Sequence, residues 1–175
     1  MPPKMRRRKQ ELSPDKAADL LRSETYGVLA LAGDGETYPY AVPLNHVYVQ
    51  GGIDDNAPLG ALYFHCAREG HKIDLFEHDP RASFCVVGKH EVIPEKFSTS
   101  YCSAIAFGTL RILDGSAKDE ALYQLSKRFD PEAHATILAE IEKHGPHCLV
   151  LELTIEHLSG KVSRDQSSAN IGVER

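Results

Sequence analysis

Residues 63–72 hold the densest set of side chains suited to chemistry. This stretch reads YFHCAREGHK, an apolar run typical of a strand that leads directly into a charged segment with helical spacing. The first turn of a helix offers unpaired N–H groups and a positive dipole end, and Gly70 permits close backbone approach. Arg68 and Lys72 add charged donors. The pattern predicts an anion site, with phosphate as the expected ligand, and the alternative is a basic helix start that only faces solvent.

Histidine and cysteine spacings do not favour a metal centre or a nucleophilic enzyme. His65 and His71 are six residues apart, and His144 and His147 are three apart, without a third ligand at zinc spacing. No G-x-S-x-G motif or C-x-x-C pair is present. We expect buried, reduced thiols at the four cysteines, which are Cys66, Cys85, Cys102 and Cys148.

A second informative stretch is YPYAVPLN at residues 38–45, where two prolines interrupt a strand-like run. Proline lacks a backbone N–H, so it belongs on edge strands or bulges. Such a strand can present backbone groups and aromatic faces to a planar heterocycle. A plain edge strand that its prolines protect from aggregation explains the same pattern.

Length and composition predict one soluble, cytoplasmic domain. The chain has 175 residues, of which 42% are hydrophobic and 26% charged, and no apolar run reaches membrane-spanning length. The net charge is −5, and it becomes −10 without residues 1–9, which argues against nucleic-acid binding by the body of the protein. We expect a basic flexible arm at residues 1–12, a folded domain at 13–162 and a polar tail at 163–175.

Turn residues and apolar periodicity predict a mainly β domain with helical excursions. Helices are expected at residues 14–23, with Ser13 as the cap, at 69–78, at 116–129, with Ser116 as the cap, and at 130–143. Strands are expected at 26–32, 38–49, 61–66, 82–87, 101–113 and 148–155, with a long loop at 50–60 and a crossover loop at 89–100. About six antiparallel strands without a G-x-G-x-x-G motif favour a barrel over a dinucleotide-binding βαβ sheet.

Taken together, several collinear segments resemble the nitroimidazole-resistance branch of the pyridoxamine 5'-phosphate oxidase-like flavoproteins. The segments are YGVLA at 26–30, YPYAVPLN at 38–45, FHCAREGHK at 64–72, ASFCVV at 82–87, PEKF at 94–97 and FG at 107–108. The resemblance covers about residues 10–162 and implies an FMN-binding split β-barrel. It also implies a homodimer in which each FMN site draws on both chains.

The resemblance also assigns roles to residues. The strand formed by Tyr40, Ala41, Val42, Pro43, Leu44 and Asn45 would lie against the isoalloxazine ring. The residues expected around the phosphate or ring are His65, Arg68, Gly70, His71 and Lys72, and Ser103 would also face the flavin. His71 falls on the histidine of the branch's G-H-K motif, and it is the candidate proton donor or substrate contact because an imidazole titrates near neutral pH. Its alternative role is to hold the phosphate or the helix start.

These expectations describe an FMN-dependent oxidoreductase that resembles nitroimidazole reductases and reduces a small substrate, such as a nitroaromatic compound, through bound FMN. The alternative is a module that binds or senses FMN or haem without a dedicated substrate, with His46, His65 or His71 as an axial imidazole. The chain has no tryptophan, and its end lacks the aromatic and basic signature with which true pyridoxamine phosphate oxidases hold their substrate. We therefore expect no turnover of pyridoxamine phosphate, which a direct assay with FMN tests.

Overall fold

The computed structural model describes residues 5–33, 35 and 38–163. Its strands are β1 (Glu11–Leu12), β2 (Tyr26–Leu31), β3 (Tyr40–Asn45), β4 (Val47–Gly51), β5 (Ala57–Cys66), β6 (Arg81–Ile93), β7 (Ser98–Leu113) and β8 (Leu149–Val162). Its helices are α1 (Pro14–Ser23), α2 (His71–His78), α3 (Gly115–Lys127) and α4 (His134–His144). Single 3-10 turns occur at η1 (Arg8–Gln10), η2 (Pro94–Lys96) and η3 (Gly145–His147). In this part of the chain, no helix combines the length and hydropathy needed to cross a bilayer.

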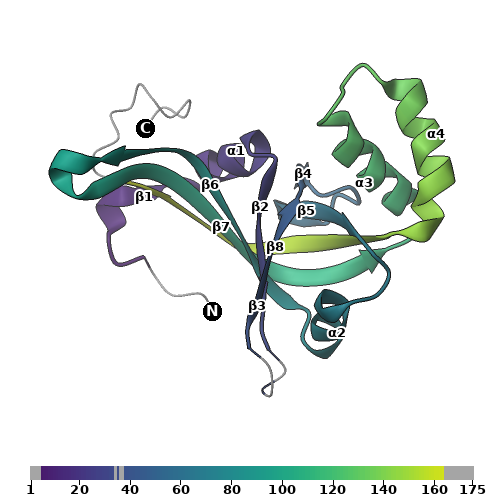
Figure 1. The fold of residues 1–175 in the computed structure, drawn as a ribbon, viewed down its shortest axis with the longest axis horizontal. Helices are drawn as coiled ribbons and strands as arrows, with labels where there is room; N and C mark the ends of the chain where they lie inside the picture. Colours follow the sequence, from purple (N-terminus) through teal and green to yellow (C-terminus); the bar gives the residue numbers. More distant parts are fainter. Residues whose placement is uncertain (1–4, 34, 36–37, 164–175) are drawn as a thin grey trace.

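All eight strands belong to one antiparallel sheet in the order β3-β2-β6-β7-β8-β5-β4, and β1 pairs with β8. Figure 1 shows the sheet strongly curved, with α3 and α4 beyond one end and the β6–β7 hairpin reaching out as an arm at the other. The prediction of a mainly antiparallel β fold with helical excursions is confirmed. The sheet has eight strands rather than about six because one expected strand is divided and a short strand forms near the N-terminus.

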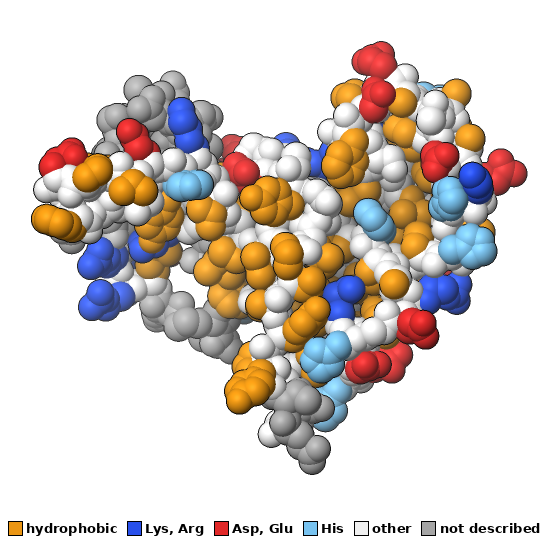
Figure 2. All heavy atoms as spheres, in the orientation of Figure 1, with side chains coloured by type: hydrophobic (Ala, Val, Ile, Leu, Met, Phe, Trp, Pro, Cys, Tyr) orange, Lys and Arg blue, Asp and Glu red, His pale blue; other side chains and the backbone are white. Residues whose placement is uncertain are grey.

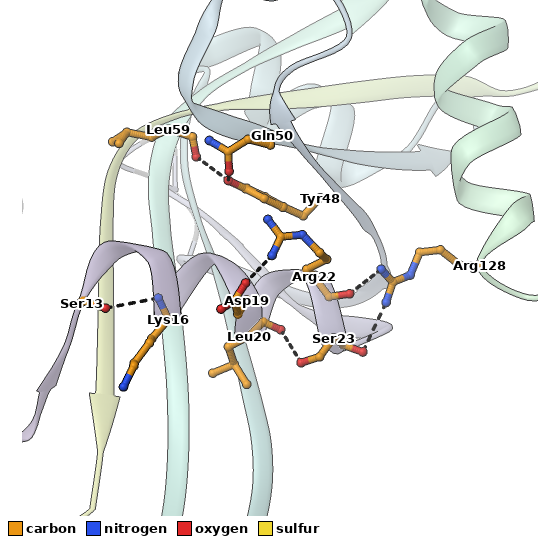
Figure 3. A network of polar contacts seen from close by, with 10 residues as sticks. All are labelled: Ser13, Lys16, Asp19, Leu20, Arg22, Ser23, Tyr48, Gln50, Leu59 and Arg128. Carbon is orange, nitrogen blue, oxygen red and sulfur yellow. Dashed lines mark hydrogen bonds and ion pairs between the residues drawn. The ribbon is translucent and has the colours of Figure 1, made fainter. Parts of the chain in front are cut away.

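Helix α1 begins and ends where its sequence predicts. Ser13 accepts a hydrogen bond from the Lys16 N–H at 3.4 Å, and Pro14 occupies the first turn. At the other end Arg128 donates to the carbonyls of Arg22 at 2.7 Å and Ser23 at 3.4 Å (Figure 3). It also donates to the carbonyl of Glu24 at 2.7 Å. This guanidinium satisfies the negative end of the helix dipole from more than 100 residues away in the chain, which local sequence signals do not reveal.

The core has two parts. The larger packs α1 against the inner face of the sheet, and its fully buried side chains include Leu21, Leu29, Phe64, Phe84 and Leu153. The smaller packs α3 against β4, β5 and β8, around Tyr63, Ala121, Leu125 and Val150. Helix α1 therefore covers the inner face of the sheet, and α3 covers the opposite face at β4, β5 and β8. On β2, β6 and β7, the side chains of that opposite face are exposed or partly exposed.

The prediction of a single strand at 38–49 is wrong. This stretch divides at His46 into β3 and β4, which pair with different neighbours, β2 and β5. His46 is buried, its Nε2 lies 2.9 Å from the Leu21 carbonyl, and its ring meets Phe84 edge-on. The chain turns there because the side chain is anchored beneath α1. The loop expected at 50–60 is also shorter, since β5 begins at Ala57.

The crossover loop expected at 89–100 is instead the end of the long β6–β7 hairpin. The ladder continues from the pair His90 and Tyr101 to the pair Ile93 and Ser98. Pro94 lies in η2 at the tip, where no ladder donor is needed. Strand β8 likewise runs on past residue 155 to Val162, paired with β7.

The expected helix starts near residues 116 and 130 also need correction. Asp114 rather than Ser116 precedes α3, and α4 begins at His134, after a turn in which the Glu132 N–H bonds Asp130. The basic arm expected at 1–12 is ordered over its described part, since η1 and β1 pack there and Gln10 is buried. Residues 1–4, and 164–175 of the expected tail, lie outside the described residues.

Candidate functional site

The junction between β5 and α2 has the geometry of an anion site. Gly70 is the N-cap of α2 with φ of 124°, a conformation that side chains disfavour, and its carbonyl accepts from the Ile73 N–H at 2.7 Å. No side chain caps this helix end. The Asp74 N–H also donates to the Gly70 carbonyl, at 3.3 Å, so in the described structure the first-turn N–H groups left without a backbone partner are those of His71 and Lys72. They lie beside the side chains of Arg68 and His71, which are both exposed.

Two predicted site elements meet at this junction. The Tyr40 ring of β3 contacts the His71 ring of α2 edge-to-face, with 5.1 Å between centroids and a 74° interplanar angle. Arg68 donates to the Pro146 carbonyl at 2.9 Å, so its guanidinium is held against η3 while the remaining donors stay exposed. Lys72 is half-buried on the same first turn. The structure therefore brings Tyr40 into contact with the helix start that carries Gly70, His71 and Lys72.

The side chains of β3 that we predict to lie against the flavin fall on two opposite faces of the strand. The alternation places Tyr40, Val42 and Leu44 against the main core. The intervening side chains, Ala41, Pro43 and Asn45, are exposed on the outer face. Asn45 donates to the Thr25 carbonyl at 3.2 Å, which fixes the end of the strand. Because β3 is the last strand of the sheet, one of its edges has no ladder partner among the described residues.

The outer face of the sheet is apolar where β2, β6 and β7 lie side by side. Val28 pairs with Cys85, which pairs with Ile105, and Val87 pairs with Ser103. The exposed fraction is 39% for Val28 and 53% for Val87. Figure 2 shows hydrophobic side chains gathered over these strands at the centre of the view. We refer to Val28, Cys85, Val87, Ile105 and Phe107 as the outer patch.

The other predicted site residues lie apart from the α2 junction. Ser103 is on β7, beside the outer patch, and among the described residues no hydrogen bond or ring contact joins it to α2. His65 is exposed near the end of β5. His46 is buried, and burial lowers its pKa to about 4. Its Nε2 is engaged by the Leu21 carbonyl, so this imidazole is not positioned as an axial ligand.

A cavity that the sequence did not suggest lies between α3 and α4. Its volume is about 760 Å³, and its lining includes Tyr123, His134, Leu138 and Ile141. The Tyr123 hydroxyl and His134 Nδ1 are 2.9 Å apart. None of the predicted site residues lines this cavity. It adjoins them only through Pro146, whose carbonyl accepts from Arg68.

The thiols and acids form no second reactive centre in the described ranges. All four cysteines are free, and burial raises the pKa of Cys66, Cys85 and Cys102, which keeps these thiols protonated. No group of three or more histidine, cysteine or carboxylate side chains there is arranged to hold a metal ion. The α2 junction and β3 therefore remain the candidate site.

Comparison with known proteins decides the family. The family model described as pyridoxamine 5'-phosphate oxidase matches residues 13–162. The chain belongs to this family. The resemblance stated from the sequence is thereby confirmed, and the open antiparallel sheet is the split β-barrel that it implied. A search of curated proteins found no match.

Three solved structures of the same fold are informative. The FAD and heme binding protein of Mycobacterium smegmatis is 27% identical, with a TM-score of 0.72 over 91% of this chain and 77% of that one. A candidate 5-nitroimidazole antibiotic resistance protein of Bacteroides thetaiotaomicron is 18% identical, with a TM-score of 0.65 over 87% and 86%. A FAD-binding protein of Mesorhizobium loti is 21% identical, with a TM-score of 0.58 over 88% and 97%.

Proposed function

We propose that this protein is a flavoprotein oxidoreductase that binds FMN at the α2 junction and β3. The observation that carries the proposal is the contact between Tyr40 and His71, which brings the aromatic strand and the anion-binding helix start together. Membership of the pyridoxamine 5'-phosphate oxidase family supports a flavin, as do the relatives described as FAD-binding.

The residues present fit the two ends of FMN. A phosphate suits the uncapped first turn of α2, where backbone N–H groups, Arg68 and Lys72 supply donors and positive charge. The positive φ of Gly70 keeps this turn free of a side chain at the closest approach. The flat ring suits β3, whose exposed Ala41 and Pro43 are small and whose free edge offers backbone groups.

A homodimer is part of the proposal. In the outer patch Val28 and Val87 are exposed, and the apolar side chains beside them are partly exposed, so the patch suits burial against a second copy. Ser103 adjoins the patch rather than the α2 junction of its own chain. A second copy seated on the patch brings its Ser103 to the neighbouring flavin, so each site would need both chains.

A bound flavin that had first taken two electrons from a reduced nicotinamide would pass them to the substrate, and the chain would supply orientation and a proton. His71 is exposed at the helix start and held by the edge of the Tyr40 ring, so its imidazole can give a proton to a substrate that gains electrons nearby. We propose a small substrate, with nitroaromatics as the first class to test because of the structural likeness to the Bacteroides protein.

A second candidate function is binding of FMN or haem without a dedicated substrate. It is favoured by the likeness to the FAD and heme binding protein of Mycobacterium smegmatis. His65 and His71 are the exposed imidazoles near the site that can approach an iron. The basic residues Arg68 and Lys72 favour a phosphate ligand instead, which is why FMN is our first proposal.

The variants Arg68→Ala and His71→Ala separate the two functions. If FMN is the cofactor, Arg68→Ala weakens FMN binding about tenfold, because a charged hydrogen bond is lost, while His71→Ala retains FMN. Under the same reading His71→Ala lowers the rate of substrate reduction. Haem ligation predicts the reverse pattern, with haem lost from His71→Ala. Arg81→Ala is the control, because Arg81 is exposed and its ion pair within the described ranges is with Asp79.

A further inference from the structure

A basic groove lies at the opposite end of the sheet from the α2 junction. One cavity of about 760 Å³ is lined by Arg6, Arg7, Arg8, Lys9, Gln10, Val162 and Ser163. A second, of about 250 Å³, is lined by Arg7, Gln10, Ser98, Thr99, Tyr101, Lys161 and Ser163. The two share three residues, so they are adjoining parts of one depression, here called the basic groove. Figure 2 shows Lys and Arg side chains gathered beneath the β6–β7 arm in this region.

The groove is fixed by the fold. Its N-terminal wall is held by η1, where the Gln10 N–H donates to the Arg7 carbonyl at 2.9 Å, and by β1, which pairs with β8. Its other wall is held by Ser163, whose N–H donates to the Tyr101 carbonyl at 2.9 Å and whose hydroxyl accepts from the Tyr101 N–H at 3.1 Å. A ligand here therefore meets positions that are already ordered.

The positive charge in the groove is not neutralised by the described protein. Arg6, Arg7, Arg8, Lys9 and Lys161 form no ion pair with a carboxylate in that part of the chain. Lys161 Nζ instead donates to the Tyr101 hydroxyl and lies over that ring. Three other arginines, Arg22, Arg81 and Arg111, each pair with an acid, whereas Arg68 and Arg128 donate to backbone carbonyls. Five groove cations without an ion pair in the described structure, in a chain of net charge −5, indicate an anionic partner.

Gln10 lies in the wall that the two cavities share. The residue is only 5% exposed, and among the described residues its buried Oε1 has no hydrogen-bond partner. This oxygen accepts hydrogen bonds, so it does not itself bind a phosphate. Buried amides in folded proteins are nearly always hydrogen-bonded. The hydroxyls of Ser98, Thr99 and Tyr101 line the smaller cavity beside it and can both donate and accept.

We propose that the basic groove binds a small ligand that carries two or more linked phosphate groups, such as the pyrophosphate of a nucleotide. Two adjoining cavities and five cations match an extended anion better than a single phosphate. A long nucleic acid is disfavoured because the rest of the chain has a net charge of −10. Lys161 of β8 pairs with Ser103 of β7, which lies beside the outer patch, so the groove borders that patch. Binding of the phosphates in the groove does not require that a flavin is bound.

Isothermal titration calorimetry with inorganic pyrophosphate, tripolyphosphate and orthophosphate tests the proposal on the full chain. We expect pyrophosphate and tripolyphosphate to bind at least about tenfold more tightly than orthophosphate, and Arg7→Gln and Lys161→Gln each to weaken that binding about tenfold or more. Lys143→Gln, which removes the same charge from the exposed end of α4, should leave it unchanged. Circular dichroism confirms that each variant is folded.

Two results would overturn the proposal. One is binding of pyrophosphate that is no tighter than orthophosphate, or that the Arg7 and Lys161 variants leave intact. The other is a random single-stranded oligonucleotide that binds the same residues more tightly than tripolyphosphate, which would make the groove a nucleic-acid site. Flavin content measured on the same preparations reports separately on the proposed flavoprotein function.

Discussion

The ring of His71, the first residue of α2, is held edge-to-face by the ring of Tyr40, the first residue of β3, with 5.1 Å between their centroids. Each side chain belongs to a different predicted part of the flavin site, one on the strand proposed for the ring and the other on the helix proposed for the phosphate. The contact therefore sets the separation between the two ends of the site. It also orients the imidazole that we propose as a proton donor.

Changing Tyr40 should alter the site through this contact. Tyr40→Phe keeps an aromatic ring against His71, so flavin affinity and turnover should stay within about twofold of the parent. Tyr40→Ala removes the ring contact, which is worth about 0.5–1.5 kcal/mol, so flavin affinity should fall about threefold to tenfold. Fluorescence titration with FMN measures both. Equal affinity in the alanine variant would show that the contact does not organise the site.

Gly70→Ala should weaken FMN binding, because it strains the backbone at the start of α2. No atom lies within 4 Å of an added Cβ, so the expected cost of about 1–2 kcal/mol comes from the positive φ rather than from a clash. Gly115→Ala is the matched control, because that glycine also has a positive φ and open space but lies at the start of α3. Both variants should lose stability on thermal unfolding, and only Gly70→Ala should lose FMN affinity. Loss of affinity in both would mean that general destabilisation is the cause.

Local signals account for what the sequence predicted well. Ser13, Pro14 and the apolar spacing that follows are local signals that predict the bounds of α1, and the strand-to-helix junction at 63–72 is equally local. The strand-to-helix junction and β3 could therefore be predicted from residue types and spacing, whereas their role in binding an anion and a flavin stays a prediction. Ser103 came only from the family resemblance, because nothing in its immediate neighbours marks it.

Long-range contacts account for what the sequence predicted poorly. Glu152 is an acid within an apolar strand, yet it is buried, and Arg111 on β7 binds both of its oxygens, at 3.0 and 2.8 Å. The turn at His46 depends on the Leu21 carbonyl and on Phe84 in the same way. Single-sequence patterns do not identify such partners, so they miss the elements that these partners fix.

We expect charged substitutions in the outer patch to weaken the homodimer. Val28→Asp and Val87→Asp place a charge where we propose that a second copy packs, so the dissociation constant of the dimer should rise at least about 100-fold. Because each flavin site would need both chains, flavin retained per chain should fall as well. Light scattering after gel filtration measures the mass. Leu138→Asp, at an exposed leucine of α4, is the control and should remain dimeric. A parent protein that is monomeric with flavin bound would contradict this part of the account.

His46 should make the fold sensitive to acid. Burial lowers its pKa from 6.5 to about 4, so the unfolded chain takes up a proton at a higher pH than the folded chain does. The free energy of unfolding should therefore fall as the pH drops from 6.5 toward 4, by up to about 3 kcal/mol from this group. In His46→Gln, whose amide can still donate to the Leu21 carbonyl, urea unfolding at pH 7 and pH 4.5 should differ less than in the parent.

The control for this measurement is His157→Gln, because His157 is exposed on β8 and its loss should leave the acid sensitivity of the parent intact. A direct check is the NMR titration of the His46 imidazole. Its signal should not change between pH 7 and pH 5.5, and a midpoint near 6.5 would be inconsistent with the buried, neutral imidazole described here.

The absorption spectrum of the protein tests the central proposal most directly. The protein is purified without added cofactor, and the spectrum is recorded before and after incubation with FMN and, separately, with haemin, each followed by removal of the excess. We predict a two-band flavin spectrum, with FMN released on denaturation. A Soret band without flavin bands, or no chromophore after both additions, would contradict the assignment of this protein as a flavoprotein.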